Sequence, residues 1–190
     1  IELRRLLKST RVASIFVTHD QEEAMVLSDH IILMNAGAVE QRGSPREIYQ
    51  QPRSLFAAAF VGAANFMNGV VVDVSANGSA IIEIDGVRLR GTACGDLGPD
   101  APATLVVKHE HVQLATDDPI DGHNVAECTF EIANFVGPSL QMHCVFRGQP
   151  VIGLVPATKR AMPRVEAGAP LRLAFHEVDA LIFPGHAARS

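Results

Sequence analysis

The organisation of the chain is set by residues 16–26, Phe16-Val17-Thr18-His19-Asp20-Gln21-Glu22-Glu23-Ala24-Met25-Val26. Residues 12–17 form a short, almost continuous apolar run, which is typical of a strand buried on both faces of a parallel sheet. Asp20 and Glu23 have the spacing of a capping box, so a helix is predicted to begin at Gln21. A strand that brings His19 to its end, directly before a capped helix, can hold a phosphate.

A second helix start lies at Ser44, which can cap the helix while Glu47 closes the box. Pro45 takes the first helical position, where its missing N–H costs nothing. Around this start the pattern predicts strands at 30–34 and 38–41, a turn at Asn35-Ala36-Gly37, and a helix at 54–61 that ends at Gly62. The first 65 residues therefore have an α/β pattern.

From Asn68 onward the apolar residues alternate instead of following a helical period, which predicts strands. Asn77-Gly78 and Asp85-Gly86 are predicted hairpin turns, because both pairs reach positive φ at little cost. We expect two domains, residues 1–65 and an all-β domain of residues 66–190.

The β domain is predicted to contain two five-stranded repeats, about residues 66–116 and 123–184, joined by a linker at 117–122. Two pairs of segments support this: Gly86-Val87-Arg88-Leu89-Arg90-Gly91 with Gly148-Gln149-Pro150-Val151-Ile152-Gly153, and Val107-Lys108-His109-Glu110 with Ala174-Phe175-His176-Glu177. Each repeat is too small to be stable alone, so the two are expected to pack together or on a second chain.

Composition excludes several classes of protein. The net charge of −5 argues against a protein that binds a phosphate backbone. No apolar run approaches the roughly 20 residues that span a bilayer. The cysteines, Cys94, Cys128 and Cys144, are odd in number and widely spaced, which favours a reducing compartment and inert packing.

Residues 12–66 resemble the end of the ATPase domain of ATP-binding cassette (ABC) importers. The likeness is carried by Phe16 to Val26, Ser28-Asp29-His30, Gly43-Ser44-Pro45-Arg46-Glu47-Ile48-Tyr49 and Phe60-Val61-Gly62-Ala63-Ala64-Asn65-Phe66. A weaker likeness over residues 67–184 extends to the tandem OB-like regulatory domain (TOBE type) of polyamine, iron and maltose importers. Where that family has Arg-Pro-Glu, this chain has Lys108-His109-Glu110 and Phe175-His176-Glu177.

The resemblance implies an α/β end of a P-loop ATPase domain followed by a tandem OB-like barrel domain. It implies that His19 is the switch histidine, which contacts the γ-phosphate and the attacking water. Lys8, Lys108 and Lys159 follow Leu, Val and Thr, so no G-x-x-x-x-G-K-[ST] loop is present. The chain is thus expected to be the C-terminal portion of the subunit, to lack the Walker A, signature and Walker B motifs, and to be inactive alone.

The resemblance also implies the cofactors, the partners and the cellular location of the subunit. ATP and Mg²⁺ would bind the full-length subunit, and His19 is the only cofactor-binding or catalytic residue expected in this chain. The expected partners are a second ATPase subunit, transmembrane permease subunits and, indirectly, a solute-binding protein, with no nucleic acid. The location would be cytoplasmic, on the inner face of the plasma membrane.

Two other classes of function compete with a transport ATPase. The first is a stand-alone OB-like module that binds a small anion or a metal. Backbone N–H groups of the glycine-flanked repeats could hold the anion. Two groups are considered as metal ligands: His109 with Glu110 and His111, and His143 beside Cys144. In neither group does the sequence supply the third and fourth ligands that a metal needs. The second is an OB-fold nucleic-acid binder, which is disfavoured because the chain has no Trp, one Tyr and a negative charge.

Overall fold

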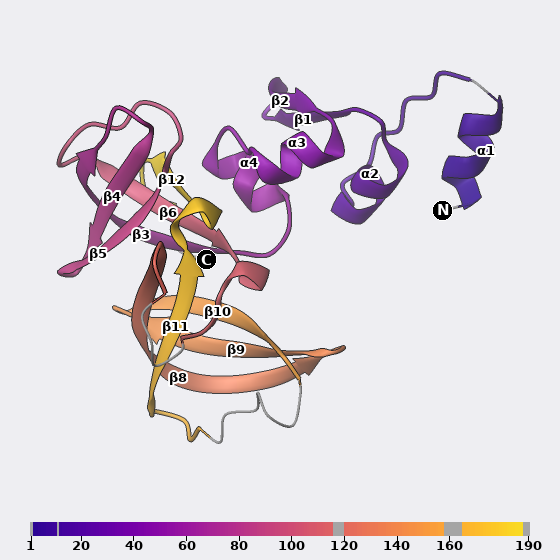
Figure 1. Ribbon diagram of the computed structural model, residues 1–190. Helices are drawn as coiled ribbons and strands as arrows, with labels where there is room; N and C mark the ends of the chain where they lie inside the picture. The colour runs from indigo at the N-terminus through magenta and orange to yellow at the C-terminus, as the bar shows by residue number, and fades with distance from the viewer. Residues whose placement is uncertain (1, 11, 116–119, 158–164, 188–190) are drawn as a thin grey trace. The chain divides into compact units, whose positions relative to one another are not determined.

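The computed structural model describes residues 2–10, 12–115, 120–157 and 165–187. The chain forms two compact units, Ile1–Gly62 and Ala63–Ser190. The first contains four short helices and one two-stranded antiparallel sheet (Figure 1). Its elements are α1 (Glu2–Thr10), α2 (Gln21–Leu27), β1 (Ile31–Asn35), β2 (Ala38–Gly43), α3 (Pro45–Gln50) and α4 (Leu55–Phe60).

Both predicted helix starts are confirmed. The Ser44 side chain accepts a hydrogen bond from the Glu47 N–H, and the Glu47 carboxylate accepts one from the Ser44 N–H at 2.7 Å. Asp20 caps α2 by accepting from the Glu23 N–H at 3.0 Å. The other hydrogen bond of the predicted capping box, from the Asp20 N–H to the Glu23 carboxylate, is wrong. The Glu23 carboxylate accepts from the Thr18 hydroxyl instead, at 2.8 Å.

The predicted buried strand at residues 12–17 is also wrong. These residues have no regular structure, and the side chains of Ile15 and Val17 are 95% and 98% exposed. A strand of a parallel sheet needs hydrogen-bonding neighbours, and the only sheet of this unit among the described residues is the β1–β2 hairpin. The parallel sheet of an ATPase domain is therefore not formed by the described residues, although the sequence of 12–17 suits one.

The second unit is all β, as predicted. It comprises a closed five-stranded barrel and an open five-stranded sheet (Figure 1). The barrel order is β12-β5-β4-β3-β6, and the sheet order is β10-β9-β8-β11-β7. The strands are β3 (Ala64–Val74), β4 (Ser79–Ile84), β5 (Val87–Ala93), β6 (Pro102–Lys108), β7 (Gln113–Leu114), β8 (His123–Val136), β9 (Ser139–Phe146), β10 (Gln149–Pro156), β11 (Pro170–His176) and β12 (Ala180–Pro184).

The two halves exchange their last strands. A short 3₁₀ helix, η1 (His109–His111), carries the chain out of the barrel, so that β7 pairs with β11 in the sheet. A second one, η2 (Glu177–Asp179), carries the chain back, so that β12 closes the barrel between β5 and β6. Two five-stranded units are thus present, but neither is made from one continuous repeat as predicted.

The exchange also corrects the predicted register of the repeats. The strands β6 and β11 are both seven residues long, and each is followed directly by its 3₁₀ helix. When these elements are aligned, Lys108 is equivalent to His176, and His111 is equivalent to Asp179. The sequence comparison pairs His109 with His176, so it is shifted by one residue. His111 Nδ1 lies 3.5 Å from the Asp179 carboxylate, so the two equivalent positions meet where the chain crosses between the halves.

The four repeated glycines have two different roles, two in hairpin turns and two beside the crossing backbone. Gly86 and Gly148 have positive φ of 80° and 72° and turn the hairpins. At the second glycine of each repeat, Gly91 and Gly153, the backbone of the crossing segment passes close to the strand. A Cβ on Gly91 would lie 2.7 Å from the Ala180 carbonyl oxygen, and one on Gly153 would lie 3.1 Å from that of Val112. Val112 O also accepts from the N–H of Leu154, so these glycines make room for the protein's own chain.

The crossing predicts that Gly91→Ala destabilises residues 63–190 strongly. The new methyl group would overlap a backbone oxygen, so β12 must shift, and we expect a loss of more than about 2 kcal/mol in the free energy of unfolding. Urea denaturation measures this loss. The control is Gly98→Ala, where an added Cβ meets no atom within 4 Å; equal losses in the two variants would contradict the account.

Candidate functional site

His19 lies exposed between residues 12–17 and α2. The residues on either side of it are fixed by hydrogen bonds. Thr18 Oγ1 accepts from the Asp20 N–H at 3.0 Å, and Asp20 Oδ1 accepts from the Glu23 N–H at 3.0 Å. Neither of these bonds uses the His19 imidazole, and the residue is exposed.

Gln21 fixes the start of α2, a role that the sequence did not reveal. Its side-chain oxygen accepts from the Gly62 N–H at 2.9 Å, while Gly62 has a positive φ of 78°. The base of the His19 loop is thereby tied to the end of α4. An imidazole held in this way can donate to a phosphate oxygen and orient a water molecule.

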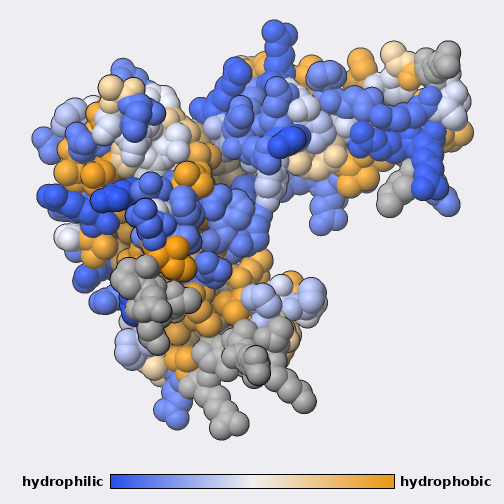
Figure 2. Space-filling view, viewed as in Figure 1, coloured by the Kyte–Doolittle hydropathy of each residue, from blue (hydrophilic) through white to orange (hydrophobic). Residues whose placement is uncertain are grey.

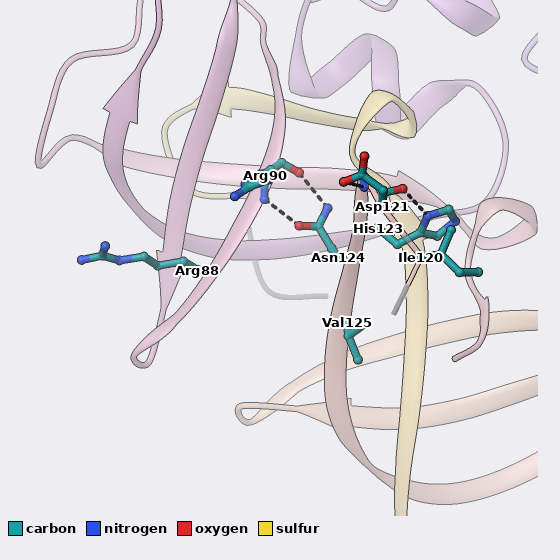
Figure 3. A pocket seen from close by; sticks show the side chains of 8 residues that line it. Arg88, Arg90, Ile120, Asp121, His123, Asn124 and Val125 are labelled. Atoms are coloured by element: carbon teal, nitrogen blue, oxygen red, sulfur yellow. Dashed lines mark hydrogen bonds between the residues drawn. The ribbon is translucent and has the colours of Figure 1, made fainter. Parts of the chain in front are cut away.

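A polar cavity of about 510 Å³ lies in the second unit, and the sequence did not predict it (Figure 3). It is lined by Arg88 and Arg90 of β5 and by residues 120–125. Arg88 Nε lies 3.2 Å from the Glu83 carboxylate, and Arg90 Nη1 lies 3.9 Å from that of Glu177. Both arginine side chains are about two-thirds exposed, so these ion pairs are weak and the guanidinium groups can turn to a ligand.

One wall of the cavity is an asparagine clamp. Asn124 Oδ1 accepts from the Arg90 N–H at 2.7 Å, and Asn124 Nδ2 donates to the Arg90 carbonyl at 2.8 Å (Figure 3). Asn65 makes the same pair of bonds to Ile152, at 2.7 and 2.8 Å. The recurrence of Asn at the second position of β3 and β8 was the sequence pattern that could have revealed this clamp.

Next to the Asn124 clamp, two histidines meet edge to face. The rings of His123 and His176 have centroids 4.9 Å apart. His176 Nδ1 accepts from the Val178 N–H at 3.2 Å, which caps η2. Gly122 has a φ of 73°, and a Cβ there would lie 2.7 Å from His176 Nε2, so the loop is closely packed against this ring.

Near the Asn65 clamp, the residue equivalent to His176 is Lys108, which is only 9% exposed. Its neighbour His109 is 8% exposed. Burial lowers the pKa of Lys108, opposed by the charge of Glu110. Burial also lowers the pKa of His109, and the nearby His143 and Lys108 act in the same direction, while Glu110 and a backbone hydrogen bond oppose it. Lys108 and His109 are therefore less accessible to a ligand than the exposed arginines of the cavity.

Of the residues considered as metal ligands, His109 and His143 lie near each other, but they do not form a complete ligand set. No group of three or more His, Cys, Asp or Glu side chains that could hold a metal ion occurs within the described ranges. His111 faces Asp179 instead. Cys128 and Cys144 are buried, and burial raises the pKa of Cys128 to about 12 and that of Cys94 and Cys144 to about 11, which disfavours the reactive thiolate.

Comparison with curated proteins finds similar sequences among ATP-binding proteins of importers. The chain is 35% identical over 158 residues to the spermidine/putrescine import ATP-binding protein PotA of Methylococcus capsulatus, covering 77% of this chain and 41% of that protein. It is 31% identical over 185 residues to the sn-glycerol-3-phosphate import ATP-binding protein UgpC 3 of Agrobacterium fabrum, covering 96% of this chain and 49% of that protein. The chain thus spans half or less of the length of these relatives.

Among solved structures, the fold resembles the cytoplasmic molybdate-binding protein ModG with molybdate bound. The TM-score is 0.55 at 17% identity, over 64% of this chain and 96% of that one. This likeness supports the OB-type fold of the β part. No protein-family profile matches the chain. None of the helices described is both long and apolar enough to cross a membrane.

The buried histidine predicts acid sensitivity. Because the pKa of His109 lies below its ordinary value of 6.5 in the folded chain, the unfolded chain binds this proton at higher pH than the folded one. Stability is therefore fully present above pH 6.5 and is lost as the pH falls towards the lowered pKa. Urea unfolding across this range should show a smaller loss in His109→Gln than in the natural chain; parallel curves would contradict the assignment, and His186→Gln serves as the control.

Proposed function

We propose that this chain, which is homologous over most of its length to ATP-binding subunits of ABC importers, is the C-terminal portion of such a subunit. Residues 1–65 would be the end of its nucleotide-binding domain. Residues 66–190 would be a TOBE-type regulatory domain, which strengthens the subunit dimer or receives a regulatory signal. ATP hydrolysis in the complete subunit would drive uptake of a small solute.

The exposed apolar run at residues 12–17 carries this proposal. Ile15 and Val17 are almost fully exposed, and on the β1–β2 hairpin Ile32, Met34 and Val39 are 57–63% exposed. Figure 2 shows hydrophobic residues at the surface of this part of the chain. Burial of a fully exposed side chain of this size contributes roughly 1.5–3 kcal/mol, and burial of a half-exposed one contributes proportionately less. A sheet completed by other strands of an ATPase domain would bury them.

Within that sheet, His19 would stand at the end of a strand, beside the nucleotide bound by the complete subunit. Water would attack the γ-phosphorus of ATP, the bond to the β-γ bridging oxygen would break, and ADP, inorganic phosphate carrying the water oxygen, and a proton would be released. Mg²⁺ held by the rest of the subunit would offset the negative charge of the phosphates. His19 would donate a hydrogen bond to a γ-phosphate oxygen and orient the water. Thr18 and Asp20 keep the loop in place through their bonds at its base. The residues that bind Mg²⁺ and grip the phosphates would belong to the rest of the subunit.

The same proposal assigns partners and location. A second ATPase subunit would pair with this one, transmembrane permease subunits would dock on it, and a solute-binding protein would act through them. The subunit would then lie in the cytoplasm against the inner face of the plasma membrane. The relatives include proteins for spermidine/putrescine and for sn-glycerol-3-phosphate import, so the homology does not single out a solute.

A second candidate function is a module that binds a small oxyanion. It is favoured by the cavity lined by Arg88 and Arg90 and by the likeness to a molybdate-binding protein. The glycine-flanked repeats do not supply the site, since Gly91 and Gly153 lie against the crossing backbone. The exposed segment 12–17 has no use in such a module, so we favour the ATPase subunit.

The proposal predicts that the chain alone neither hydrolyses ATP nor binds it tightly. Isothermal titration should detect no micromolar affinity. In a chimera, residues 1–62 replace the homologous segment of the Methylococcus capsulatus relative, and we expect ATP hydrolysis to be retained. His19→Ala in that chimera should lower turnover by roughly 10²–10³-fold, as for loss of one donor to the transition state. The matched control is His30→Ala, because His30 is another exposed histidine. Equal effects of the two substitutions would contradict the role proposed for His19.

The second candidate predicts a different result with the same protein. Titration of the chain with molybdate, sulfate and phosphate should release heat if the cavity binds an oxyanion. Arg90→Gln should then weaken binding at least about tenfold, because a charge-assisted hydrogen bond is lost. Binding that Arg90→Gln leaves unchanged would exclude the cavity as the site.

A further inference from the structure

The hydrogen bonds around the His19 loop, residues 18–20, fix its shape but not its place in the first unit. The Thr18 hydroxyl donates to Glu23, and the Asp20 N–H donates to Thr18. The Glu23 N–H donates to Asp20. All of these partners lie within five residues of one another in the sequence. The loop therefore forms one corner with the first turn of α2, and this corner is positioned by the contacts that hold α2.

The contacts that hold α2 are modest. None of its seven residues is buried, although Ala24 and Met25 pack, partly exposed, against the small apolar cluster of the unit. Before the loop, residues 12–17 have no regular structure and are exposed. A strand formed by these residues in a complete subunit would fix the loop from its N-terminal side. The side that continues into α2 needs a support of its own.

Gln21 provides that support by joining α2 to a firmer part of the unit. Its side-chain oxygen accepts from the Gly62 N–H at 2.9 Å, across 41 residues of sequence. Gly62 follows Val61, which is 1% exposed and whose N–H caps α4 by donating to the Ala57 carbonyl at 3.2 Å. Ala57 is fully buried. The Gly62 N–H is thus well fixed, and Gln21 brings this anchor within two residues of His19.

The anchoring N–H also lies where the chain leaves the first unit. Gly62 is the last residue of that unit, and its φ of 78° favours glycine. Ala63 begins the second unit, and its carbonyl oxygen accepts from the His109 N–H at 3.2 Å. A change in the backbone angles of this connecting segment would therefore turn the Gly62 N–H away from Gln21.

We propose that Gln21 is a positioning residue for His19, and that it makes the place of the His19 loop depend on the backbone conformation at Gly62. Gln21 acts through the first turn of α2 and needs no contact with ATP. Loss of one hydrogen bond of this kind changes the equilibrium between an anchored and a released loop about two- to tenfold. The catalytic part of this inference rests on the function proposed above, whereas the anchoring of the loop can be measured without ATP.

The first test is amide hydrogen exchange in the 190-residue chain, followed by NMR. Gln21→Met removes the acceptor and keeps the length of the side chain, whereas Gln21→Glu keeps an acceptor oxygen. With Gln21→Met, we expect the Gly62 and Asp20 amides to exchange about two- to tenfold faster; with Gln21→Glu, both rates should return. Asp20 reports on the loop because its N–H donates to Thr18. Faster exchange at Gly62 alone would overturn the proposal, because the loop would then hold itself in place.

The second test is ATP hydrolysis by the chimera with residues 1–62, which contains both partners of the bond. Gln21→Met should lower kcat at least about threefold and leave the KM for ATP unchanged, because His19 would act in the transition state. Gln21→Glu should restore kcat. The matched control is Gln50→Met, because Gln50 accepts from Arg46 within α3. Equal values of kcat for Gln21→Met and the unsubstituted chimera would contradict the positioning role.

A double-mutant cycle tests whether Gln21 and Gly62 act through the same bond. Gly62→Ala disfavours the positive φ at this position, so it too should lower kcat. Combined with Gln21→Met, it should lower kcat no further than the more harmful substitution does alone. Effects that multiply would show that the two residues act independently and would refute the dependence on the backbone at Gly62. Circular dichroism and urea unfolding establish that each variant is folded.

The outcomes distinguish failure of this inference from failure of the proposed function. If His19→Ala lowers turnover but Gln21→Met changes neither turnover nor the exchange of Asp20, the ATPase assignment stands and the role of Gln21 falls. If the chimera is inactive or His19→Ala has no effect, the ATPase assignment falls. The exchange rates of the 190-residue chain then still decide whether Gln21 anchors the loop.

Discussion

The structure of residues 63–190 depends on the exchange of two strands. β12 closes the barrel from the far end of the sequence, and β7 completes the sheet from the first repeat. The buried side chains of both halves consequently form one continuous cluster. Gly91 and Gly153 permit the close approach of the crossing backbone, and His111 meets Asp179 at the crossing point. A change at the crossing therefore acts on both halves at once.

Because the two halves have similar folds, features that occur in both belong to the fold, whereas features that occur in only one half are not required by it. The clamps of Asn65 and Asn124 occur in both halves, so they belong to the scaffold. Other equivalent positions differ: Ile152 in one half is matched by Arg90 in the other, and Lys108 is matched by His176. The open cavity beside Arg90 is a departure of this kind. Such departures are where specific functions of the β domain are to be sought.

Local features could be predicted from the sequence, whereas long-range ones could not. The caps at Asp20 and Ser44 and the turn at Asp85-Gly86 were predicted because they depend on neighbouring residues. The strand exchange pairs Leu181 with Thr92, and no periodicity reveals such a partner. Residues 12–17 have the composition of a strand without the neighbours that would make one. His19 could be located from its loop. The cavity of Arg88 and Arg90 could not be predicted, because it is lined by segments that are separated in sequence by β6 and β7.

The exchanged strand also sets the order in which the protein can fold as it leaves the ribosome. β3 to β6 emerge early and can pair with one another, yet the barrel stays open until residues 180–184 have been made. During that interval the inner faces of β5 and β6 are exposed to solvent and to other nascent chains. Because loop-closure entropy must be overcome before such distant contacts form, closure is slow compared with hairpin formation. The apolar inner face of the half-built barrel therefore stays uncovered for longer than that of a hairpin that closes locally.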